Sequence, residues 1–367
     1  MQIFQAVEVS VEKDEIVWAV VDDLFVLSEE CRGYALWLAH SGRAINTQKA
    51  YQLRLARFLS WCAEMETKWE GLRFHQLAAY KACLEGLPDK TGGRLSGKTV
   101  NAHLTAVMVF LRYAVAHGFG TDQLRATVEG GRHTVASLGP EGQWKTAPAR
   151  LVKAREIKRR PVVLTWSQVA RVLDSVERPR DRLLVLLMLR CGLRAGEVLG
   201  LRLEDMHMLP DSGHLGCTIP GPHVHVERRS NPNGAWAKSP YERNVPVPAD
   251  VCEVHAAYMA QRYASYGGNQ PDALFLSLTT KSPQPLGYPG LHRMLASVGN
   301  TTGLPVRAHQ FRHTAATGWA RAKVDPDVIM GLLGHRSLAS TSIYLHPAQE
   351  ELRRAVEETL PGKDAPQ

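Results

Sequence analysis

The chain has 367 residues, of which 44% are hydrophobic and 22% are charged, and its formal net charge at pH 7 is +8. This length accommodates two domains, and the ordinary composition excludes a disordered or fibrous protein. The positive charge favours a polyanionic partner, although charge alone does not establish one. No stretch approaches the roughly 20 apolar residues of a membrane span, and the N-terminus lacks the features of a secretory signal. We therefore expect a soluble cytoplasmic protein with no membrane partner.

The cysteines are scattered along the chain without C-x-x-C pairs, at Cys31, Cys62, Cys83, Cys191, Cys217 and Cys252. Three of them lie within helix-like patterns. This usage is typical of reduced, buried thiols in a cytosolic protein and not of a disulfide framework.

Residues 1–24 alternate weakly between apolar and polar positions, so a strand and an arm both stay open for this segment. A helical period then continues over residues 25–130. It predicts four helices: one that contains Leu36–His40, one from Asn46 or Thr47 to Cys62, one at Phe74–Leu84, and one from Ser96 or Thr99 to Gly118. We expect these helices to form a small bundle.

Residues 131–160 differ in composition, because they are rich in glycine, proline and small residues and carry an excess of basic side chains. One interpretation is a solvated interdomain linker. The other is a basic strap along a nucleic-acid backbone, in which Lys158, Arg159 and Arg160 bind DNA. The two interpretations are compatible.

A second domain opens at residue 161, where Thr165 and Gln168 have the spacing of a capping box. The helix DRLLVLLMLRCG is apolar on nearly every side, so it should be deeply buried and should present Arg194 at its C-terminal end. Alternating runs at 223–227 and 243–247 predict a β-hairpin with a long loop. Further helices are predicted at Val251–Tyr266, Pro289–Val298, His309–Ala322, Pro326–Leu333 and Ser340–Leu345.

These elements predict a mainly α protein with a small antiparallel β-sheet or hairpin, an α+β fold. The second domain extends to residue 347. Residues 348–367 form a predicted C-terminal helix and tail, in which Leu352, Val356 and Leu360 recur every four residues with no obvious packing partner.

Basic side chains precede a tyrosine near the end of the second domain. His309 and Arg312 are three residues apart and share one face of a predicted helix. His335 follows a glycine, and Tyr344 lies nine residues later. With Arg194, these residues suggest a cationic pocket around a phosphate.

A tyrosine phenolate in such a pocket can attack the phosphorus of a phosphodiester, and the phosphotyrosine formed conserves the bond energy for religation. Arg194 and Arg312 suit the phosphate, because a guanidinium donates two parallel hydrogen bonds and keeps its charge. The departing 5′-oxygen needs a proton, which Lys238 in the predicted hairpin loop can give.

The two histidines have their own candidate roles. His309 can serve in proton transfer near Tyr344, and His335 can donate a hydrogen bond to a phosphate oxygen. His309 and His313 also have the i, i+4 spacing of a zinc pair. However, the residue after His309 is not the glutamate of H-E-x-x-H, and no carboxylate cluster completes a site. We therefore predict no metal. Taken singly, each arginine is more often a surface residue and a tyrosine a packed aromatic.

Five sequence blocks together resemble the tyrosine recombinases, the phage-integrase family of site-specific recombinases. They are CGLRAGEVLGLRLEDM with Arg194, AKSPYERNVPV with Lys238, HQFRHTAAT with His309 and Arg312, LLGHRS with His335, and TSIYLHP with Tyr344. The resemblance covers residues 160–346, and residues 27–118 resemble the family's core-binding domain more weakly. The SLGPEGQWK linker and the SNPNGAWAK insert resemble the transposase-A-type recombinases of bacterial transposons.

The resemblance implies a helical core-binding, DNA-binding domain at 25–130 and a catalytic domain at 161–347 that form a C-shaped clamp around double-stranded DNA. It implies a 3′-phosphotyrosyl intermediate with neither a metal nor a nucleotide cofactor. It also implies a homo-tetramer that exchanges strands between two duplexes, with accessory recombination proteins as further partners. The function expected is integration or transposition of a mobile element in the bacterial cytoplasm, in association with the nucleoid.

The resemblance also implies roles for individual residues. Those that bind and activate the scissile phosphate are Arg194, Arg312 and His335. Lys238 is the general acid, His309 assists, Tyr344 attacks, and Glu197 matches an acidic position that supports the first arginine. The hairpin insert before Lys238 is longer than in the simplest members of the family. The C-terminal helix of family members docks on a neighbouring protomer.

Two other functions stay open. A type IB topoisomerase-like enzyme shares this pocket but only relaxes DNA, and a non-catalytic DNA-binding regulator can retain the pocket without using it. The helical N-terminal pattern and the C-terminal helix favour recombination over both.

Overall fold

The structure is a computed structural model that divides into two compact units, Met1–Lys158 and Arg159–Gln367. The residues it describes are 2–10, 16–89, 92–129, 134–138, 144–148, 152–156, 161–237, 239, 241–268, 270–277, 283–335 and 337–344. Each unit has a hydrophobic core of its own.

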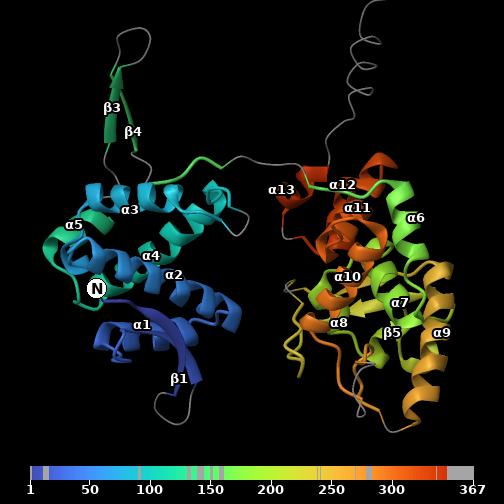
Figure 1. Cartoon of the computed structure of the whole chain (residues 1–367). Coiled ribbons are helices and arrows are strands. Elements are labelled where there is room, and N and C mark those ends of the chain that lie inside the picture. Colours follow the sequence, from blue (N-terminus) through green and yellow to red (C-terminus); the bar gives the residue numbers. More distant parts are fainter. Residues whose placement is uncertain are drawn as a thin grey trace, which may run out of the picture. The chain divides into compact units, whose positions relative to one another are not determined.

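The first unit is a helical bundle (Figure 1). Its helices are α1 (Glu29–His40), α2 (Ile45–Glu64), α3 (Phe74–Gly86), α4 (Gly97–Ala116) and α5 (Asp122–Glu129), with a short 3-10 turn, η2, at Trp69–Gly71. Aromatic side chains form much of its core, because Tyr34, Phe58, Tyr80 and Phe110 are almost completely buried. The four predicted helices are confirmed, and α5 was not predicted.

Helix α4 runs through the core of this bundle. It begins after Ser96, whose hydroxyl oxygen accepts a hydrogen bond from the backbone N–H of Thr99, as expected of an N-cap. By length and composition alone α4 could cross a membrane, which was not expected from the sequence. More than half of its most apolar window is buried inside the unit, so its hydropathy is that of a core helix.

Residues before the bundle form a strand pair, so this segment is a strand and not an extended arm. Strand β1 (Gln5–Ser10) pairs antiparallel with β2 (Ile16–Val21), and both pack against α2. The side chains of Val17 and Ala19 are buried, and the backbone N–H of Phe4 donates a hydrogen bond to the Ser60 hydroxyl.

The predicted linker contains backbone structure that its composition did not indicate. Strands β3 (Thr134–Leu138) and β4 (Trp144–Pro148) pair antiparallel. Further along, the amide of Asn101 on α4 exchanges two hydrogen bonds with the backbone of Ala154. The predicted linker at 131–160 therefore contains a strand pair and a segment that hydrogen-bonds to α4. The proposed DNA-binding residues Lys158, Arg159 and Arg160 lie outside the described residues.

Helices of the second unit surround one buried helix (Figure 1). They are α6 (Trp166–Asp174), α7 (Pro179–Leu189), α8 (Ala195–Leu199), α9 (Ala249–Tyr266), α10 (Tyr288–Thr302), α11 (Ala308–Arg321), α12 (Pro326–Leu333) and α13 (Leu338–Thr341). Helix α7 is buried on nearly every side and packs against α9 and α11, as its apolar sequence predicted. The Thr165 capping box at the start of α6 is also confirmed.

A small antiparallel sheet completes the second unit. Its order is β5 (Met206–His207), β6 (His223–Val226) and β7 (Arg243–Pro246). The hairpin of β6 and β7 was predicted from alternation, whereas the two residues of β5 are too few to carry that signal. The fold is mainly α with small antiparallel sheets, so the predicted fold class is confirmed.

Three predictions about the chain need correction. Arg194 is not at the end of α7, because it is the N-cap residue of the short helix α8. The predicted helix Ser340–Leu345 is instead α13 followed by a 3-10 turn, η5, at Ser342–Tyr344. Not all cysteines are buried, since Cys83 is exposed and Cys217 and Cys252 are half-buried. The candidate general acid Lys238 and the predicted C-terminal helix at 348–367 lie outside the described residues.

Candidate active site

A buried glutamate holds three arginines together in the second unit. Glu197, on α8, accepts a hydrogen bond of 2.7 Å from Nη1 of Arg194 and one of 2.8 Å from Nη2 of Arg243. Nη1 of Arg312 lies 3.8 Å from the same carboxylate. Burial alone would raise the pKa of Glu197, but the charges of the arginines, Arg243 first, lower it below its ordinary value. The carboxylate is therefore ionised and fixes the arginines in place.

Arg312 lies on α11 and is buried, with 1% of its side chain exposed. Its Nη1 donates a 2.6 Å hydrogen bond to the carbonyl of Gly192, and its Nη2 donates to the carbonyl of Leu333. Burial, followed by the charges of Arg194 and Arg243, lowers the pKa of Arg312 to about 9. The guanidinium thus stays protonated at neutral pH, and a buried cation in this position favours an anionic ligand.

The end of α12 brings a histidine to the arginines. Gly334 adopts a left-handed backbone with φ of +59°, and its carbonyl lies 3.5 Å from Nη2 of Arg194. In His335, which follows, Nδ1 lies 2.9 Å from the hydroxyl oxygen of Thr341. Burial, then the charges of the nearby arginines, lowers the pKa of His335 to about 4, so its imidazole is neutral at pH 7.

Tyr344 lies in the turn η5 and is buried, with 6% of its surface exposed. Its hydroxyl oxygen lies 2.7 Å from Nδ1 of His313, and its ring lies nearly parallel to that of His335. Burial raises the pKa of the Tyr344 phenol, whereas Arg312 and Arg194 act to lower it. Burial, then His309 and Arg312, lowers the pKa of His313 to about 4, so a neutral imidazole faces the phenol.

A cavity opens beside this cluster. Its volume is about 440 Å³, and its lining includes Arg194, His309 and Arg312 together with residues of α10. His309 is exposed, and its ring centroid lies 4.0 Å from that of His313. The cavity therefore offers an anion access to cationic and imidazole side chains.

The predicted residues Arg194, His309, Arg312, His335 and Tyr344 are brought together in this cluster, although they come from four separate blocks of the sequence. The contacts of Arg243, His313 and Thr341 were not predicted from the sequence. For His313 a signal existed, because it lies four residues after His309 and on the same helical face. No comparable signal marks Arg243 or Thr341.

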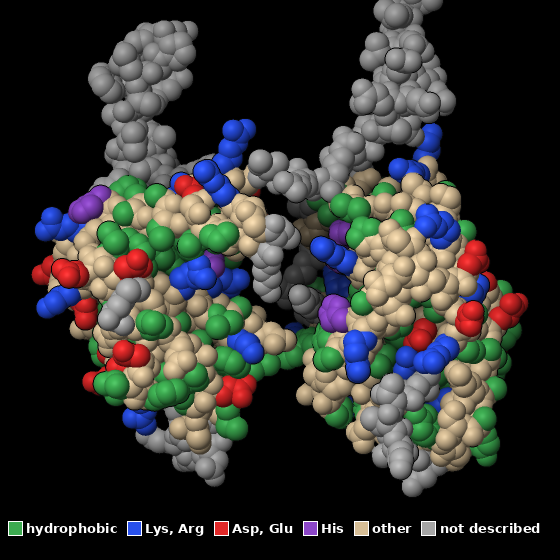
Figure 2. Space-filling view, in the orientation of Figure 1, with side chains coloured by type: hydrophobic (Ala, Val, Ile, Leu, Met, Phe, Trp, Pro, Cys, Tyr) green, Lys and Arg blue, Asp and Glu red, His purple; other side chains and the backbone are tan. Residues whose placement is uncertain are grey.

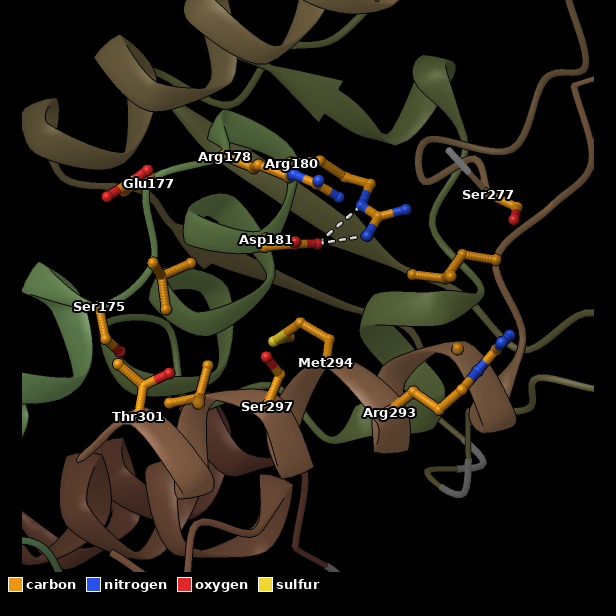
Figure 3. A pocket seen from close by; sticks show the side chains of 14 residues that line it. Ser175, Glu177, Arg178, Arg180, Asp181, Ser277, Arg293, Met294, Ser297 and Thr301 are labelled. Carbon is orange, nitrogen blue, oxygen red and sulfur yellow. Dashed lines mark hydrogen bonds and ion pairs between the residues drawn. The ribbon is translucent and has the colours of Figure 1, made fainter. Parts of the chain in front are cut away.

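A second cavity of about 440 Å³ lies between the start of α7 and α10 (Figure 3). None of the predicted site residues that the structure describes lines it. The figure shows Arg180 paired with Asp181, and this guanidinium also donates to the Leu276 carbonyl. Because these groups satisfy each other, the Arg180–Asp181 pair is structural and offers no free charge to a ligand.

The model of the phage integrase family matches residues 162–351, which is more than half of the chain. The chain belongs to the phage integrase family. Transposase A of transposon Tn554 from Staphylococcus aureus is 26% identical over 373 aligned residues, covering 98% of this chain and 98% of the relative. Tyrosine recombinase XerA of Pyrococcus furiosus is 29% identical over 210 residues, covering 57% of this chain and 65% of the relative. Both the family and its transposase-A-type branch agree with the resemblance found in the sequence.

Solved structures show the same fold. The Tn1549 transposon integrase in complex with a circular intermediate DNA aligns with a TM-score of 0.60 and 16% identity, covering 90% of this chain and 99% of that chain. XerH recombinase bound to a palindromic difH substrate aligns with a TM-score of 0.59 and 19% identity, covering 90% and 85%. The chain is thus a tyrosine recombinase, an enzyme of site-specific DNA breakage and rejoining, as the sequence predicted.

Proposed function

We propose that Tyr344 is the nucleophile of this recombinase and that it attacks a scissile phosphodiester held by Arg194, Arg312 and His335. The phenolic oxygen forms a bond to phosphorus as the bond from phosphorus to the 5′-oxygen breaks. The product is a 3′-phosphotyrosyl intermediate and a free 5′-hydroxyl. Attack by that hydroxyl, or by one from another duplex, reverses the step and reseals a strand.

The contact between Tyr344 and His313 carries the proposal. A phenol with a raised pKa is a poor nucleophile at neutral pH unless a base takes its proton. The neutral imidazole of His313, whose Nδ1 is 2.7 Å from the phenolic oxygen, can accept that proton in one tautomer. His309, whose ring packs on His313, assists from the rim of the cavity.

The arginines act on the charge of the phosphate. The transition state of phosphoryl transfer spreads negative charge over the non-bridging oxygens, and preorganised donors stabilise that charge. Glu197 holds Arg194 and Arg243 before any ligand arrives, so little reorganisation is needed. The Nε2 of His335 can donate to a phosphate oxygen when its Nδ1 accepts from Thr341.

Proton delivery to the departing 5′-oxygen is assigned to Lys238 on its place in the AKSPYERNVPV block alone, since this lysine lies outside the described residues. A lysine ammonium carries three donors on a flexible stem and suits a general acid on a hairpin loop.

Double-stranded DNA is the proposed partner, with the helical unit at 25–130 as the core-binding domain and residues 161–347 as the catalytic domain. The net charge of +8 supports it, and Lys and Arg side chains lie on the face of each unit drawn in Figure 2. Lys158, Arg159 and Arg160 are proposed to contact the phosphate backbone. The solved structures of XerH and of the Tn1549 integrase are complexes of those proteins with DNA.

Transposition or integration of a mobile element in the bacterial cytoplasm, at the nucleoid, is the biological setting we propose. The match to transposase A of Tn554 over 98% of both chains supports this choice. A homo-tetramer on two duplexes, assisted by accessory recombination proteins, would bring two sites together for exchange. Residues 348–367 would join neighbouring protomers in that assembly.

A suicide substrate tests the chemistry. A nicked duplex from the ends of the host element, incubated without added metal, should trap a covalent protein–DNA complex that is visible on a denaturing gel. The variant Tyr344→Phe should give none while retaining a mobility shift. Absence of the complex with the native chain, despite tight binding to the same DNA, would favour a regulator.

A second assay separates recombination from the topoisomerase-like alternative. The native chain should join two sites on separate duplexes. Relaxation of supercoiled DNA by a monomer, without joining at any protein concentration, would favour that alternative.

A further inference from the structure

Four potential metal ligands meet at one end of the β5–β6–β7 sheet, and the proposed chemistry uses none of them. They are His207, Cys217, His223 and His225, and each offers one ligand atom within 4.8 Å of the others. His207 and His223 are buried, whereas Cys217 and His225 are half-buried. Three imidazoles and one thiol make a donor set that suits zinc, which binds imidazole nitrogen and thiolate sulfur.

Three of the four ligand atoms are separated by distances close to those of a zinc ligand shell. Sγ of Cys217 lies 3.3 Å from Nε2 of His223 and 3.6 Å from Nε2 of His225, and the two Nε2 atoms are 3.0 Å apart. Zinc bonds of about 2.0 Å to nitrogen and about 2.3 Å to sulfur place ligands of a tetrahedral site roughly 3.3–3.6 Å apart. The observed separations surround a point at bonding distance from all three atoms.

The hydrogen bond that His223 makes outside the cluster fixes its tautomer and leaves its Nε2 without a proton. Nδ1 of His223 lies 2.7 Å from the carbonyl oxygen of Gly221, and a carbonyl only accepts, so Nδ1 carries the proton. The lone pair of its Nε2 then points at Cys217 and His225. This arrangement, in which a backbone carbonyl fixes the tautomer, is common for metal-bound histidines. Within the described part of the chain, the buried Nδ1 of His207 has no hydrogen-bond partner.

Local structure explains why these residues meet. His223 and His225 alternate along β6 and therefore share one face of the sheet. His207 pairs with His223 in the antiparallel register of β5 and β6. The segment between the two strands, 208–222, returns Cys217 to the same face.

We propose that His207, Cys217, His223 and His225 bind one Zn²⁺ ion that ties β5, the 208–222 segment and β6 together. Four protein ligands close a tetrahedral shell and leave no position for a substrate, so the ion is structural. From the sequence, zinc was considered only at His309 and His313, and no metal was predicted. Residues 223–227 indicated only a strand, because the four ligands do not follow a familiar zinc spacing.

Metal content tests the proposal directly. The full chain, purified without a polyhistidine tag and dialysed against metal-free buffer, should retain about one zinc per chain by mass spectrometry of the metals. Replacement of zinc by Co²⁺ should give the visible bands of tetrahedral cobalt and a near-ultraviolet thiolate-to-metal band. That spectrum is recorded on the native chain, so it does not depend on the folding of a variant. A chain without zinc and without the cobalt bands would overturn the proposal.

Matched variants locate the ion. The double variant Cys217→Ser/His225→Ala should lose the zinc and the thiolate band. His214→Ala, from the same segment and exposed, and Cys252→Ser, a half-buried thiol on α9, should each keep about one zinc. Zinc that persists in the double variant but disappears in His309→Ala would place the ion at the His309–His313 pair and refute the assignment.

Discussion

Nδ1 of His313 lies 2.7 Å from the hydroxyl oxygen of Tyr344, and the phenol is buried beside arginines that Glu197 holds together. This contact joins α11 to the turn η5, although the two residues are 31 positions apart in the sequence. It gives the proposed nucleophile a base in the absence of DNA.

His313→Ala should slow formation of the covalent complex on the suicide substrate by about 10²–10⁴-fold, because the phenol loses its proton acceptor. Added imidazole should restore part of the rate by filling the space of the missing ring, which loss of packing alone would not allow. His214→Ala is the matched control and should react at the native rate. A His313→Ala rate equal to the native rate would show that another group accepts the proton.

Glu197→Gln should lower the free energy of unfolding by about 3 kcal/mol, since it removes the charge that compensates buried arginines. The folded pKa of Glu197 lies below its ordinary value of 4.5, so its stabilising effect is present above pH 4.5 and is lost as the pH falls through the folded pKa. Urea unfolding of the native chain and of Glu197→Gln measures the two free energies of unfolding. Their difference should be largest near neutral pH and should become smaller in acid. A difference that widens in acid would contradict this account.

Gly192→Ala should destabilise the chain more than Gly303→Ala, although both glycines have positive φ. A left-handed alanine costs about 1–2 kcal/mol at either position. At Gly192 a Cβ would also lie 2.8 Å from the ring of Trp319, which adds about 1–3 kcal/mol of overpacking and shifts the carbonyl that binds Arg312. A Cβ at Gly303 would have no atom of the described residues within 4 Å, apart from its own chain neighbours. If thermal unfolding gave the same loss of stability for Gly192→Ala and Gly303→Ala, the site around Gly192 would tolerate the methyl group.

Replacing Lys158, Arg159 and Arg160 by glutamine should weaken binding to all DNA sequences and reduce the slope of log affinity against log salt by roughly 2–3. The control variant replaces Lys81 and Arg125, two basic residues that already pair with acidic neighbours on their own helices. Titration by fluorescence anisotropy at several salt concentrations measures both slopes. An unchanged slope in the triple variant would leave these residues as linker only.

Local signals explain how much of the fold could be predicted from the sequence. Helix α12 has the predicted bounds, because its Asp325 N-cap and its Gly334 stop are encoded within a few residues. Helix α5 was missed, and the strands β3 and β4 lie in a segment whose glycine and proline content indicates loop. Short elements of this kind depend on pairing partners more than on their own composition.

The candidate site could also be predicted only in part from the sequence. The order of the motifs along the chain is enough to identify Arg194, Arg312, His335 and Tyr344 as candidates. The role of Arg243 depends on a carboxylate 46 residues away, and the zinc ligands depend on the register of β5 and β6. Neither the Arg243–Glu197 contact nor the grouping of the zinc ligands can be predicted from hydrophobic periodicity, because both arise only when distant segments pack together.

The most direct test of the central claim is to identify the residue that is joined to DNA in the trapped complex. Proteolysis followed by mass spectrometry should find a nucleotide linked through its 3′-phosphate to the peptide that contains Tyr344. The same peptide from His313→Ala should carry the adduct at a lower yield. An adduct on another tyrosine, or one linked through a 5′-phosphate, would contradict the assignment of Tyr344 as the nucleophile.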